Sequence, residues 1–321
     1  MNPPYDLNKK ILKLVSDISF QLGELKSYTI PKATPMLRKQ NKIKTIQASL
    51  EIEGNYFDTD LVSAVLEGKR VVGAKKELLE VQNAIKVYEE IVNLKPNTVQ
   101  SFLKAHKILM DGLIDNPGRF RNKGVGVFSG DKFVHMAPPH TLVSAHIDNL
   151  FDYIKNSDDD MLILSCVAHY EIEFIHPFSD GNGRIGRLWQ SLLLAKENAV
   201  FEYLPFETVI RDTQQEYYKA LADANKEGKA TKFIEYMLAT INQSLKELVI
   251  DLNNGKPQTA EERLELYITY NKREMFTRKN YMDVWREISP ATASRDLQHA
   301  VETKKLEKEG DKNTTKYKVK E

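Results

Sequence analysis

The sequence predicts an all-α core that carries one small β-hairpin and is followed by a small C-terminal domain. Apolar residues recur at helical spacing along most of the 321 residues, beginning with the stretch from Leu7 to Leu25. Two short apolar runs, residues 124–128 and 132–136, flank a Ser-Gly-Asp turn and predict the hairpin. A polar segment with both Gly and Pro, residues 253–259, ends the helical pattern and predicts a linker.

The periodic segments predict four regions: an N-terminal helical region (1–95), a core (96–252), the linker (253–259) and a C-terminal domain (260–321). Thr98 follows Pro96-Asn97 and is expected to cap a helix. After a break with two prolines at residues 29–35, we expect helices over residues 60–67, 75–94, 98–110, 141–155, 159–174, 183–198, 208–225 and 231–252.

The C-terminal domain combines three predicted helices with two predicted strands. Ser289 is a good N-cap, and Pro290 stands at the helix position that tolerates proline best. The elements are a helix at 260–269, a helix at 277–288, the helix that starts at Ser289, and strands at 305–308 and 315–319. This order resembles a winged helix-turn-helix domain.

Composition excludes several classes of protein. A net charge of +1 and a pI of about 7.7 give no global polyelectrolyte signal. The single cysteine, Cys166, excludes an internal disulfide and lies in an apolar segment, which favours a buried helical residue over a nucleophile. No apolar run is long enough to span a membrane and the first residues lack a signal-peptide pattern, so we expect a cytoplasmic protein.

The run from His176 to Arg187, His-Pro-Phe-Ser-Asp-Gly-Asn-Gly-Arg-Ile-Gly-Arg, is the most informative segment. Pro177 disfavours a helical residue before it, so His176 should stand where a helix gives way to a loop. Histidine is also the usual proton acceptor near neutral pH. The helical pattern resumes near Gly183, and the free N–H groups of a helix that begins there form an anion site.

Other residues of this run suit phosphate chemistry. Gly181 and Gly183 allow a backbone to approach a ligand closely. Arg184 and Arg187 are three residues apart, hence on one helical face, and their forked donors suit phosphate oxygens. Asp180 supplies an oxygen ligand of the kind that Mg²⁺ accepts beside phosphates. A single Gly-x-Gly usually marks only a turn, but the combination favours a nucleotide site.

The twelve residues match the signature of the Fic (Fic/Doc-fold) family at every position. The chain therefore resembles that family. The resemblance implies transfer of AMP from ATP to a protein hydroxyl, with His176 as the base and Asp180 as the Mg²⁺ ligand. It implies that Asn182 and the loop amides hold the α-phosphate. The β- and γ-phosphates would be bound by Arg184 and Arg187.

A second motif lies upstream. The segment Ser49-Leu-Glu-Ile-Glu53-Gly-Asn55 resembles the inhibitory motif of the same family. Helical spacing before it, and a Gly-Asn pair that favours a left-handed cap, place Glu53 in the last turn of a helix. The resemblance implies that Glu53 pairs with Arg187 and blocks productive ATP binding, with Ser49 and Asn55 completing the motif. An isolated surface charge is the alternative when Glu53 is considered alone.

The resemblance also extends to two weaker parallels. The predicted hairpin corresponds to the flap that docks the target protein by strand addition, an interaction for which an exposed strand edge is suited; without the resemblance, an ordinary surface hairpin is equally compatible. Tyr218 and Asn225, two helical turns apart, correspond to residues that frame the adenine. The implied flap residues are Phe133, Val134, His135 and Met136, and the implied nucleotide-binding residues are Asp180, Gly181, Asn182, Gly183, Arg184, Gly186, Arg187, Tyr218 and Asn225.

Two classes of function therefore follow. The first is an autoinhibited AMP transferase that uses ATP and Mg²⁺ and modifies a Ser, Thr or Tyr hydroxyl of a target protein or of the chain itself. The second is a DNA-binding transcriptional regulator whose core senses nucleotide; the intact His176 favours the first, because a sensor needs no base. Removal of AMP, with Glu53 aligning a water, is a variant of the first. The resemblance also implies a homodimer.

DNA binding through residues 260–321 is a separate question. Residues 256–321 hold 15 basic and 12 acidic side chains, a net charge of +3, which is short of a strong phosphate-binding footprint. Winged helices also serve as protein-contact modules. The candidate DNA contacts are Arg295, Gln298, Lys312 and Lys316.

Overall fold

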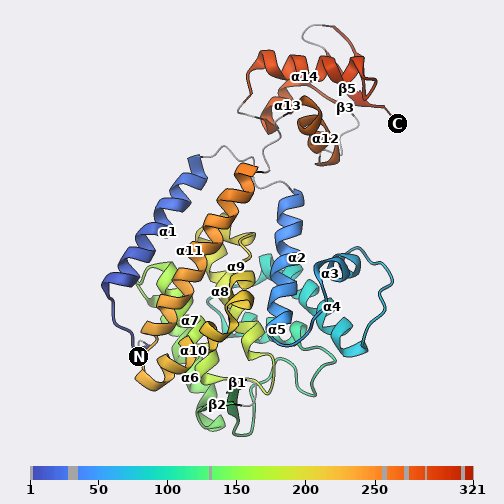
Figure 1. Cartoon of the computed structure of the whole chain (residues 1–321). Coiled ribbons are helices and arrows are strands. Elements are labelled where there is room, and N and C mark those ends of the chain that lie inside the picture. The colour runs from blue at the N-terminus through green and yellow to red at the C-terminus, as the bar shows by residue number, and fades with distance from the viewer. Residues whose placement is uncertain are drawn as a thin grey trace. The chain divides into compact units, whose positions relative to one another are not determined.

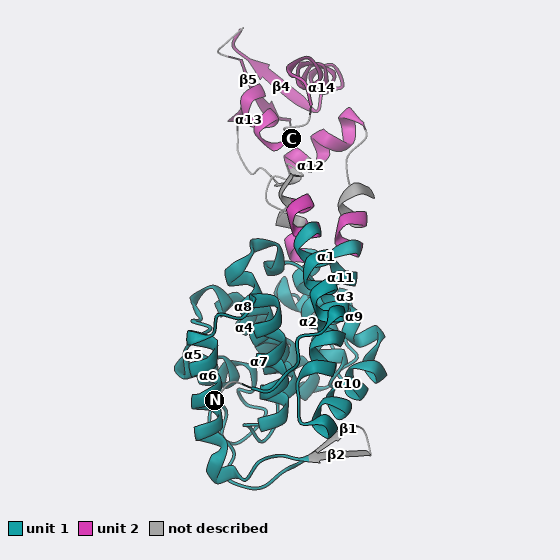
Figure 2. Ribbon diagram, turned by 90° about the vertical axis from the view of Figure 1, so that its left-hand side faces the viewer, with its two compact units in different colours: residues 1–20, 40–246 teal, residues 21–39, 247–321 magenta. Residues whose placement is uncertain are grey.

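The computed structural model describes residues 3–27, 35–129, 132–254, 259–270, 275–285, 288–311 and 315–320 (Figure 1). Two compact units are distinguished (Figure 2). Unit 1 comprises residues 1–20 and 40–246, and unit 2 comprises residues 21–39 and 247–321. The predicted N-terminal region and core thus fall largely into one unit. Within the described residues, no helix has both the length and the apolar character needed to cross a membrane.

Helices make up most of the first 254 residues, as the sequence predicts. The consecutive helices α7 and α8 form the centre of unit 1, where most residues of both are buried. The elements are α1 (Lys9–Ser27), α2 (Pro35–Glu51), α3 (Thr59–Leu66), α4 (Lys75–Glu90), η1 (Ile91–Asn93), α5 (Val99–Leu109), β1 (Gly126–Ser129), β2 (Lys132–Met136), η2 (His140–Leu142), α6 (Val143–Asn156), α7 (Met161–Ile175), α8 (Asn182–Glu197), η3 (Ala199–Glu202), α9 (Phe206–Asp212), α10 (Gln214–Glu227) and α11 (Thr231–Asn254).

Local sequence signals explain where these helices begin. The Thr98 side chain accepts a hydrogen bond from the Ser101 amide, which confirms the predicted cap of α5. Asp160 caps α7 in the same way, by accepting a hydrogen bond from the Leu162 amide. Caps of this kind stabilise a helix by about 1 kcal/mol each, so the ends of these two helices are set by neighbouring residues.

Several boundaries differ from the sequence-based expectation, among them the end of the second C-terminal helix, expected at 288 and observed at Val284. The segment predicted as one helix at 208–225 is two helices, α9 and α10, which meet at Thr213. Thr213 leaves helical geometry, and its hydroxyl donates to the Val209 carbonyl. Threonine hydroxyls can bond to backbone carbonyls and so compete with helix formation. The apolar periodicity of residues 208–225 does not reveal such a local break. The predicted linker also begins later, because α11 continues to Asn254; residues 255–258 lie outside the described ranges.

The predicted hairpin is present. Strands β1 and β2 pair antiparallel, with Gly126 opposite Met136, and a bulge follows Val127. The stem is closed by a hydrogen bond from the Ala137 amide to the Val125 carbonyl, 3.2 Å long. Residues 130 and 131 of the expected turn lie outside the described ranges.

The C-terminal part of unit 2 has its own small core. Its elements are α12 (Ala260–Tyr270), β3 (Met275–Phe276), α13 (Arg278–Val284), α14 (Pro290–Glu302), β4 (Leu306–Glu309) and β5 (Lys316–Val319), with the strands in the order β3-β5-β4. Tyr267, Tyr281 and Leu297 are among the buried residues that pack together. Ser289 caps α14 and Pro290 opens it, as predicted. The short β3 was not predicted, because two residues carry no periodic signal.

A buried ion pair joins α12 to α14. The Arg263 guanidinium donates two hydrogen bonds, of 2.7 and 2.9 Å, to the Asp296 carboxylate, which is 4 % exposed. The Tyr281 hydroxyl donates a third, 3.3 Å long, to the same carboxylate. A buried carboxylate requires such partners, so Asp296 belongs to the structural core of this domain.

The contact of α7 with α8 leaves no room for a side chain at Gly186. A β-carbon at this position would lie 2.8 Å from the Cδ2 atom of the buried His169 ring. We therefore expect Gly186→Ala to lower the free energy of unfolding of unit 1 by about 1–3 kcal/mol through overpacking. The measurement is urea unfolding followed by Trp189 fluorescence, with Trp285, the only other tryptophan, replaced by Phe.

Gly124→Ala is the matched control. Gly124 is exposed and a β-carbon there meets no atom within 4 Å. Its substitution should change the free energy of unfolding by less than about 1 kcal/mol. Equal effects of the two substitutions would contradict the assignment of Gly186 to the helix contact.

Candidate functional site

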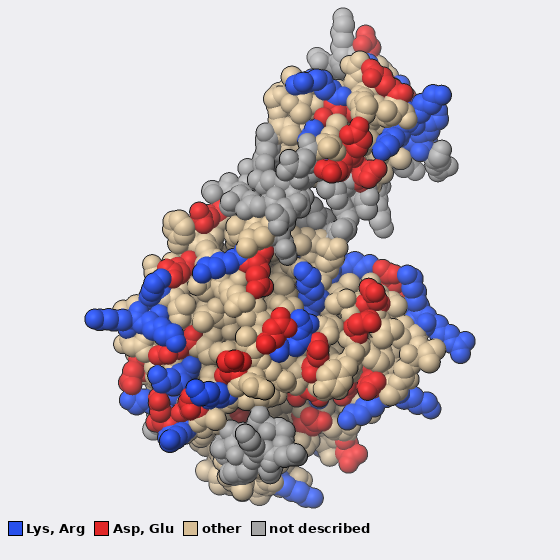
Figure 3. All heavy atoms as spheres, viewed as in Figure 1, with Lys and Arg blue, Asp and Glu red and all other residues tan. Residues whose placement is uncertain are grey.

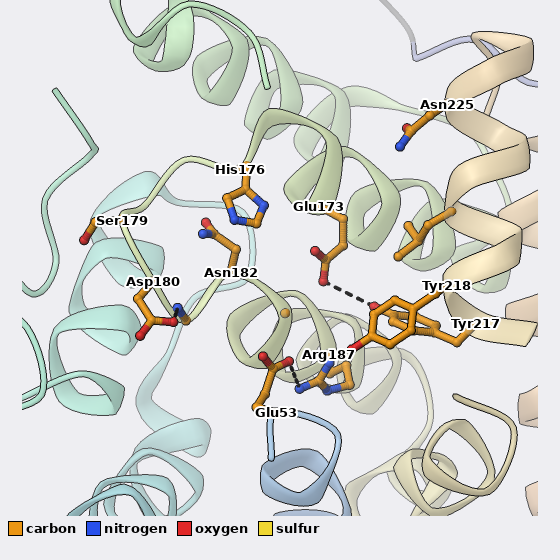
Figure 4. Close-up of a pocket in the computed structure, with 13 residues that line it drawn as sticks. Glu53, Glu173, His176, Ser179, Asp180, Asn182, Arg187, Tyr217, Tyr218 and Asn225 are labelled. Atoms are coloured by element: carbon orange, nitrogen blue, oxygen red, sulfur yellow. Dashed lines mark hydrogen bonds and ion pairs between the residues drawn. The ribbon is translucent and has the colours of Figure 1, made fainter. Parts of the chain in front are cut away.

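One pocket of unit 1 collects most of the predicted site residues (Figure 4). It lies where the C-terminus of α7, the N-terminus of α8, the end of α2 and one face of α10 meet. The lining consists of Glu53, Glu173, His176, Ser179, Asp180, Gly181, Asn182, Gly183, Arg187, Tyr217, Tyr218, Leu221 and Asn225. As far as the structure describes the pocket, Arg184 and Gly186 are not part of this lining.

The loop from His176 to Gly181 is held in an unusual backbone conformation. His176 ends α7 with φ 49° and ψ 60°, in the left-handed region. For a residue other than glycine this conformation costs about 1–3 kcal/mol and persists only where its surroundings enforce it. Gly181 has φ 82°, and a β-carbon there would lie 2.6 Å from the Met110 sulfur. Glycine is therefore required at 181 for both conformation and space.

Asn182 closes the loop from within. Its side-chain oxygen accepts a hydrogen bond of 2.9 Å from the Phe178 amide, and its side-chain nitrogen donates one of 3.0 Å to the Phe178 carbonyl. The side chain is 2 % exposed. Asn182 thus fixes the shape of the loop here, whereas its expected contact with a phosphate stays a prediction.

Phe178 anchors the loop against α5. Its ring stacks on the buried His106 ring at a centroid distance of 3.5 Å. The His106 Nδ1 atom accepts a hydrogen bond from the Gly118 amide, so the proton is on Nε2, which donates to the Asp180 carbonyl over 2.9 Å. Burial lowers the pKa of His106 to about 4, and the ring stays neutral at physiological pH.

The N-terminus of α8 lies at the pocket. The Asp180 carboxylate accepts a hydrogen bond of 2.6 Å from the Gly181 amide and pairs with Arg184 at 3.3 Å. Arg184 also pairs with Glu80 of α4 at 3.4 Å, and the other Glu80 oxygen accepts a hydrogen bond from Asn55. The first arginine of the signature is therefore linked to both the Asp180 loop and the last residue of the upstream motif.

Arg187 is the most deeply buried charge at the site. Its side chain is 1 % exposed, and it pairs with the Glu53 carboxylate at 2.8 Å (Figure 4). The same guanidinium donates to the Ser49 hydroxyl at 3.1 Å and to the Ser49 carbonyl at 2.9 Å. Burial alone would lower the pKa of Arg187, but the charge and hydrogen bond of Glu53 hold the pKa above its ordinary value.

Gly183 permits this pairing. A β-carbon at Gly183 would lie 2.4 Å from the Glu53 Oε1 atom and 3.1 Å from an Arg187 nitrogen. The absent side chain therefore lets the carboxylate approach the first turn of α8. An anion at that position also meets the unpaired N–H groups of the helix.

Helix α2, which carries Glu53 just beyond its end, is docked by polar contacts. The Thr45 hydroxyl and the Ser191 hydroxyl each donate to the buried Glu207 carboxyl, at 3.2 and 3.0 Å. Burial raises the pKa of Glu207 to about 7. Gln214 of α10 donates to the Ile52 carbonyl at 2.8 Å. These bonds set the position of the helix end, and through it the position of Glu53.

Sequence reasoning missed a buried polar group beside Arg187. Tyr217 donates to the Glu173 carboxylate at 3.2 Å, and its hydroxyl lies 3.0 Å from His169, whose other nitrogen lies 2.7 Å from Gln190. Burial raises the pKa of Glu173, but hydrogen bonding and charge from His169, together with the charges of His176 and Arg187, hold it below its ordinary value. His169 and Glu173, four residues apart in the mainly apolar α7, were the available signal.

The remaining predicted residues lie around the pocket and the hairpin. Tyr218 and Asn225 line the pocket from α10, and the Asn225 side-chain oxygen accepts a hydrogen bond from the Tyr170 hydroxyl. Met136, at the end of β2, is 66 % exposed. The other expected docking residues, Phe133, Val134 and His135, belong to strand β2; their side chains lie outside the described part of the structure. Gly186 packs on His169 and is not part of the pocket lining described above.

Comparison with known proteins identifies the family. The Fic/DOC family matches residues 96–194. The crystal structure of a Fic family protein from Desulfovibrio desulfuricans G20 is 37 % identical, covers 100 % of this chain and 98 % of its own, and has a TM-score of 0.77. The pocket, built from the Fic signature, lies on an all-α fold with a small hairpin. The chain belongs to the Fic family.

More distant relatives carry a named activity. The protein adenylyltransferase fic-1 of Caenorhabditis briggsae is 24 % identical over 262 residues, which are 76 % of this chain and 48 % of that protein. Protein adenylyltransferase Fic of Nematostella vectensis is 26 % identical over 66 % of this chain and 50 % of its own length. The chain thus spans about half the length of the curated relatives it matches. The structure of Fic-1 from C. elegans, 19 % identical with a TM-score of 0.62, covers 76 % of this chain and 73 % of its own and shares the fold.

The neutral His106 has a measurable consequence for stability. Because its folded-state pKa of about 4 lies below the ordinary value near 6.5, the unfolded chain binds one more proton between these two pH values. The contribution of His106 is present above pH 6.5 and is lost as the pH falls toward 4, by about 1.4 kcal/mol per unit. We expect the free-energy difference between the parent chain and His106→Gln to shrink accordingly.

Urea unfolding followed by Trp189 fluorescence between pH 7.5 and pH 5 measures that difference, again with Trp285 replaced by Phe. Using the difference between two chains cancels the opposite contribution of Glu207, whose raised pKa favours the folded state at low pH. His140→Gln removes an exposed histidine and serves as the control. A pH-independent difference for His106→Gln would contradict its burial as a neutral ring.

Proposed function

We propose that this protein is an autoinhibited protein adenylyltransferase, which transfers AMP from ATP to a hydroxyl side chain of a target protein. The observation that carries the proposal is the ion pair between Glu53 and the buried Arg187, made across the N-terminus of α8 in a pocket that also holds His176. The names of the curated relatives support the same activity.

In the proposed reaction, His176 accepts the proton of the target hydroxyl. The hydroxyl oxygen then attacks the α-phosphorus of ATP, a new bond to that phosphorus forms, and the bond from the α-phosphorus to the bridging oxygen breaks. Pyrophosphate leaves, and AMP stays on the target. The loop amides and the N-terminus of α8 stabilise the charge that develops on the phosphate, and positioning contributes most of the rate.

The residues present fit a magnesium ion that is bound jointly by the protein and by the phosphates of the substrate. Asp180 offers a half-exposed carboxylate at the pocket, and the described residues contain no group of three side chains that would hold a metal alone. Mg²⁺ is commonly bound by one carboxylate and substrate phosphates, and when bound it neutralises phosphate charge. Asp180 is thus the residue that would hold the ion. Arg184 would hold a phosphate after exchanging its contact with Glu80.

Inhibition follows from competition for one buried cation. The γ-phosphate of ATP and the Glu53 carboxylate both require Arg187, and the carboxylate is already in place at 2.8 Å. The two hydrogen bonds to Ser49 hold the guanidinium without contribution from Glu53. Removing Glu53 should therefore leave Arg187 positioned and ready for phosphate, which distinguishes a blocking carboxylate from a structural one.

The test replaces Glu53. A hydrogen bond to a charged group contributes about 1.5–3 kcal/mol. Its loss in Glu53→Gly should therefore raise the rate of AMP transfer about ten- to hundredfold. The measurement is incorporation of α-labelled phosphate from ATP with Mg²⁺, into the chain itself and into added protein. His176→Ala in the Glu53→Gly chain should abolish it.

Glu51→Gly is the matched control, because Glu51 stands two residues earlier and pairs with Arg211 rather than Arg187. It should leave the rate near that of the parent chain. An unchanged rate in Glu53→Gly would contradict autoinhibition, and persistent transfer in the His176→Ala chain would contradict the proposed base.

We further propose that the domain formed by residues 260–321 is a winged helix-turn-helix module that contacts protein. The order of its helices and its three-stranded sheet support the module. On its surface basic and acidic side chains are interspersed (Figure 3), in line with a net charge of only +3 over residues 256–321. Arg295 and Gln298 are exposed on α14, Lys316 is exposed on β5, and Lys312 lies outside the described ranges.

A gel-shift titration with mixed genomic fragments at low and raised salt checks this role. With so few excess cations, we expect no retention that decreases steeply with salt. Retention that Arg295→Ala weakens at low salt would assign the module to DNA instead.

A further inference from the structure

Arg121 is a buried cation that none of the predicted roles explains. Its side chain is 6 % exposed, and its described partners are all main-chain carbonyls. A buried charge without such partners is strongly unfavourable, so the guanidinium holds the segments that supply them. Those segments are the end of α7 and the two sides of the hairpin stem.

The first set of bonds fixes the catalytic loop. The Arg121 Nε atom donates to the His176 carbonyl at 2.8 Å, and one terminal nitrogen donates to the Ile175 carbonyl at 3.3 Å. The Arg121 amide donates to the Pro177 carbonyl at 2.9 Å. Carbonyls at the end of a helix lack internal partners and form the negative end of its dipole, where a cation is favoured.

These bonds account for the left-handed conformation of His176. A non-glycine residue adopts φ 49° only when its neighbours enforce it, and here three successive carbonyls, from Ile175 to Pro177, bond to one residue. The direction of the His176 side chain depends on that backbone conformation. Arg121 therefore bonds to the backbone that sets the direction of the imidazole, and its described partners do not include the imidazole itself.

The second set of bonds fixes the hairpin. The same guanidinium donates to the Lys123 carbonyl at 2.8 Å, before β1, and to the Pro138 carbonyl, after β2. Lys123 and Pro138 flank the stem that the Ala137–Val125 hydrogen bond closes. One rigid, planar group thus binds both sides of the hairpin base and the end of α7.

We propose that Arg121 is a positioning residue that holds His176 and the hairpin base in one arrangement, so that a target segment added to the hairpin edge is aligned with the imidazole. This inference rests on the proposed adenylyl transfer. The guanidinium makes four hydrogen bonds with donors in a fixed fork, and a lysine, whose ammonium has three donors, cannot replace all four bonds.

The experiment uses the full chain with Glu53→Gly, in which AMP transfer is expected to be measurable. Arg121→Gly is compared with Arg119→Gly; Arg119 is an exposed arginine two residues earlier in the same turn. Self-labelling with α-labelled ATP and Mg²⁺ gives the rate of transfer, and calorimetry gives the Kd of ATP with Mg²⁺. Hydrogen exchange is followed at the amides of His176, Phe178 and residues 125–136.

For Arg121→Gly we expect at least a hundredfold lower rate of transfer with a Kd for ATP within about twofold of the Glu53→Gly chain. Guanidinium chloride at tens of millimolar should raise the rate of transfer by Arg121→Gly at least tenfold. Sodium chloride of equal ionic strength should not raise it. Exchange should accelerate at the loop and hairpin amides together. Arg121→Lys should give an intermediate rate, and Arg119→Gly should change none of these quantities.

Unchanged transfer in Arg121→Gly would overturn the inference. So would a parallel loss of transfer and ATP binding with no recovery in guanidinium, since that outcome indicates a general loss of structure. If the Glu53→Gly chain binds ATP but transfers no AMP, the proposed function fails separately. The exchange data then decide the positioning role, which is overturned if only one of the two segments responds.

Discussion

The buried Arg187 guanidinium is the charge on which the arrangement of the site depends. The Arg187 side chain is almost fully excluded from water, and a cation in that position requires compensating charges or hydrogen-bond partners. Ser49 and Glu53 supply them from the segment that ends α2, and Glu173 adds a second negative charge nearby. Because Glu53 supplies the anion, the end of α2 is docked at the pocket, and the carboxylate lies close to Gly183. The same ion pair occupies Arg187.

The loop between α7 and α8 is held by a different set of contacts. Each of its unusual features has a partner from another element: His106 of α5 stacks on Phe178, Arg121 bonds the carbonyl of His176, and Asn182 closes the turn. These contacts compensate for the left-handed backbone at His176. The N-terminus of α8 and His176, the proposed base, are therefore held in one arrangement, which is the condition under which charge stabilisation accelerates a reaction.

Much of the fold could be predicted because local rules decide it. Caps at Thr98 and Ser289 and the apolar periodicity set the helices close to their observed bounds. Prediction was incomplete where a contact overrides periodicity, as at Thr213, whose hydroxyl bonds a carbonyl and separates α9 from α10. The close contact of Gly186 with His169 was also not foreseen, since a glycine required by a helix contact resembles one required by a ligand.

The sequence alone determined the family resemblance, the signature run from His176 to Arg187 and the pairing of an upstream glutamate with a downstream arginine as a hypothesis. These depend on residue types at fixed spacing, which the chain displays directly. Only the tertiary structure decided that Arg187 is fully buried, that Glu53 reaches it at 2.8 Å, and that Arg121 joins the hairpin base to the end of α7. The Glu53–Arg187 and Arg121–His176 contacts join groups far apart in the sequence, and burial, not spacing, determines the energies of these contacts.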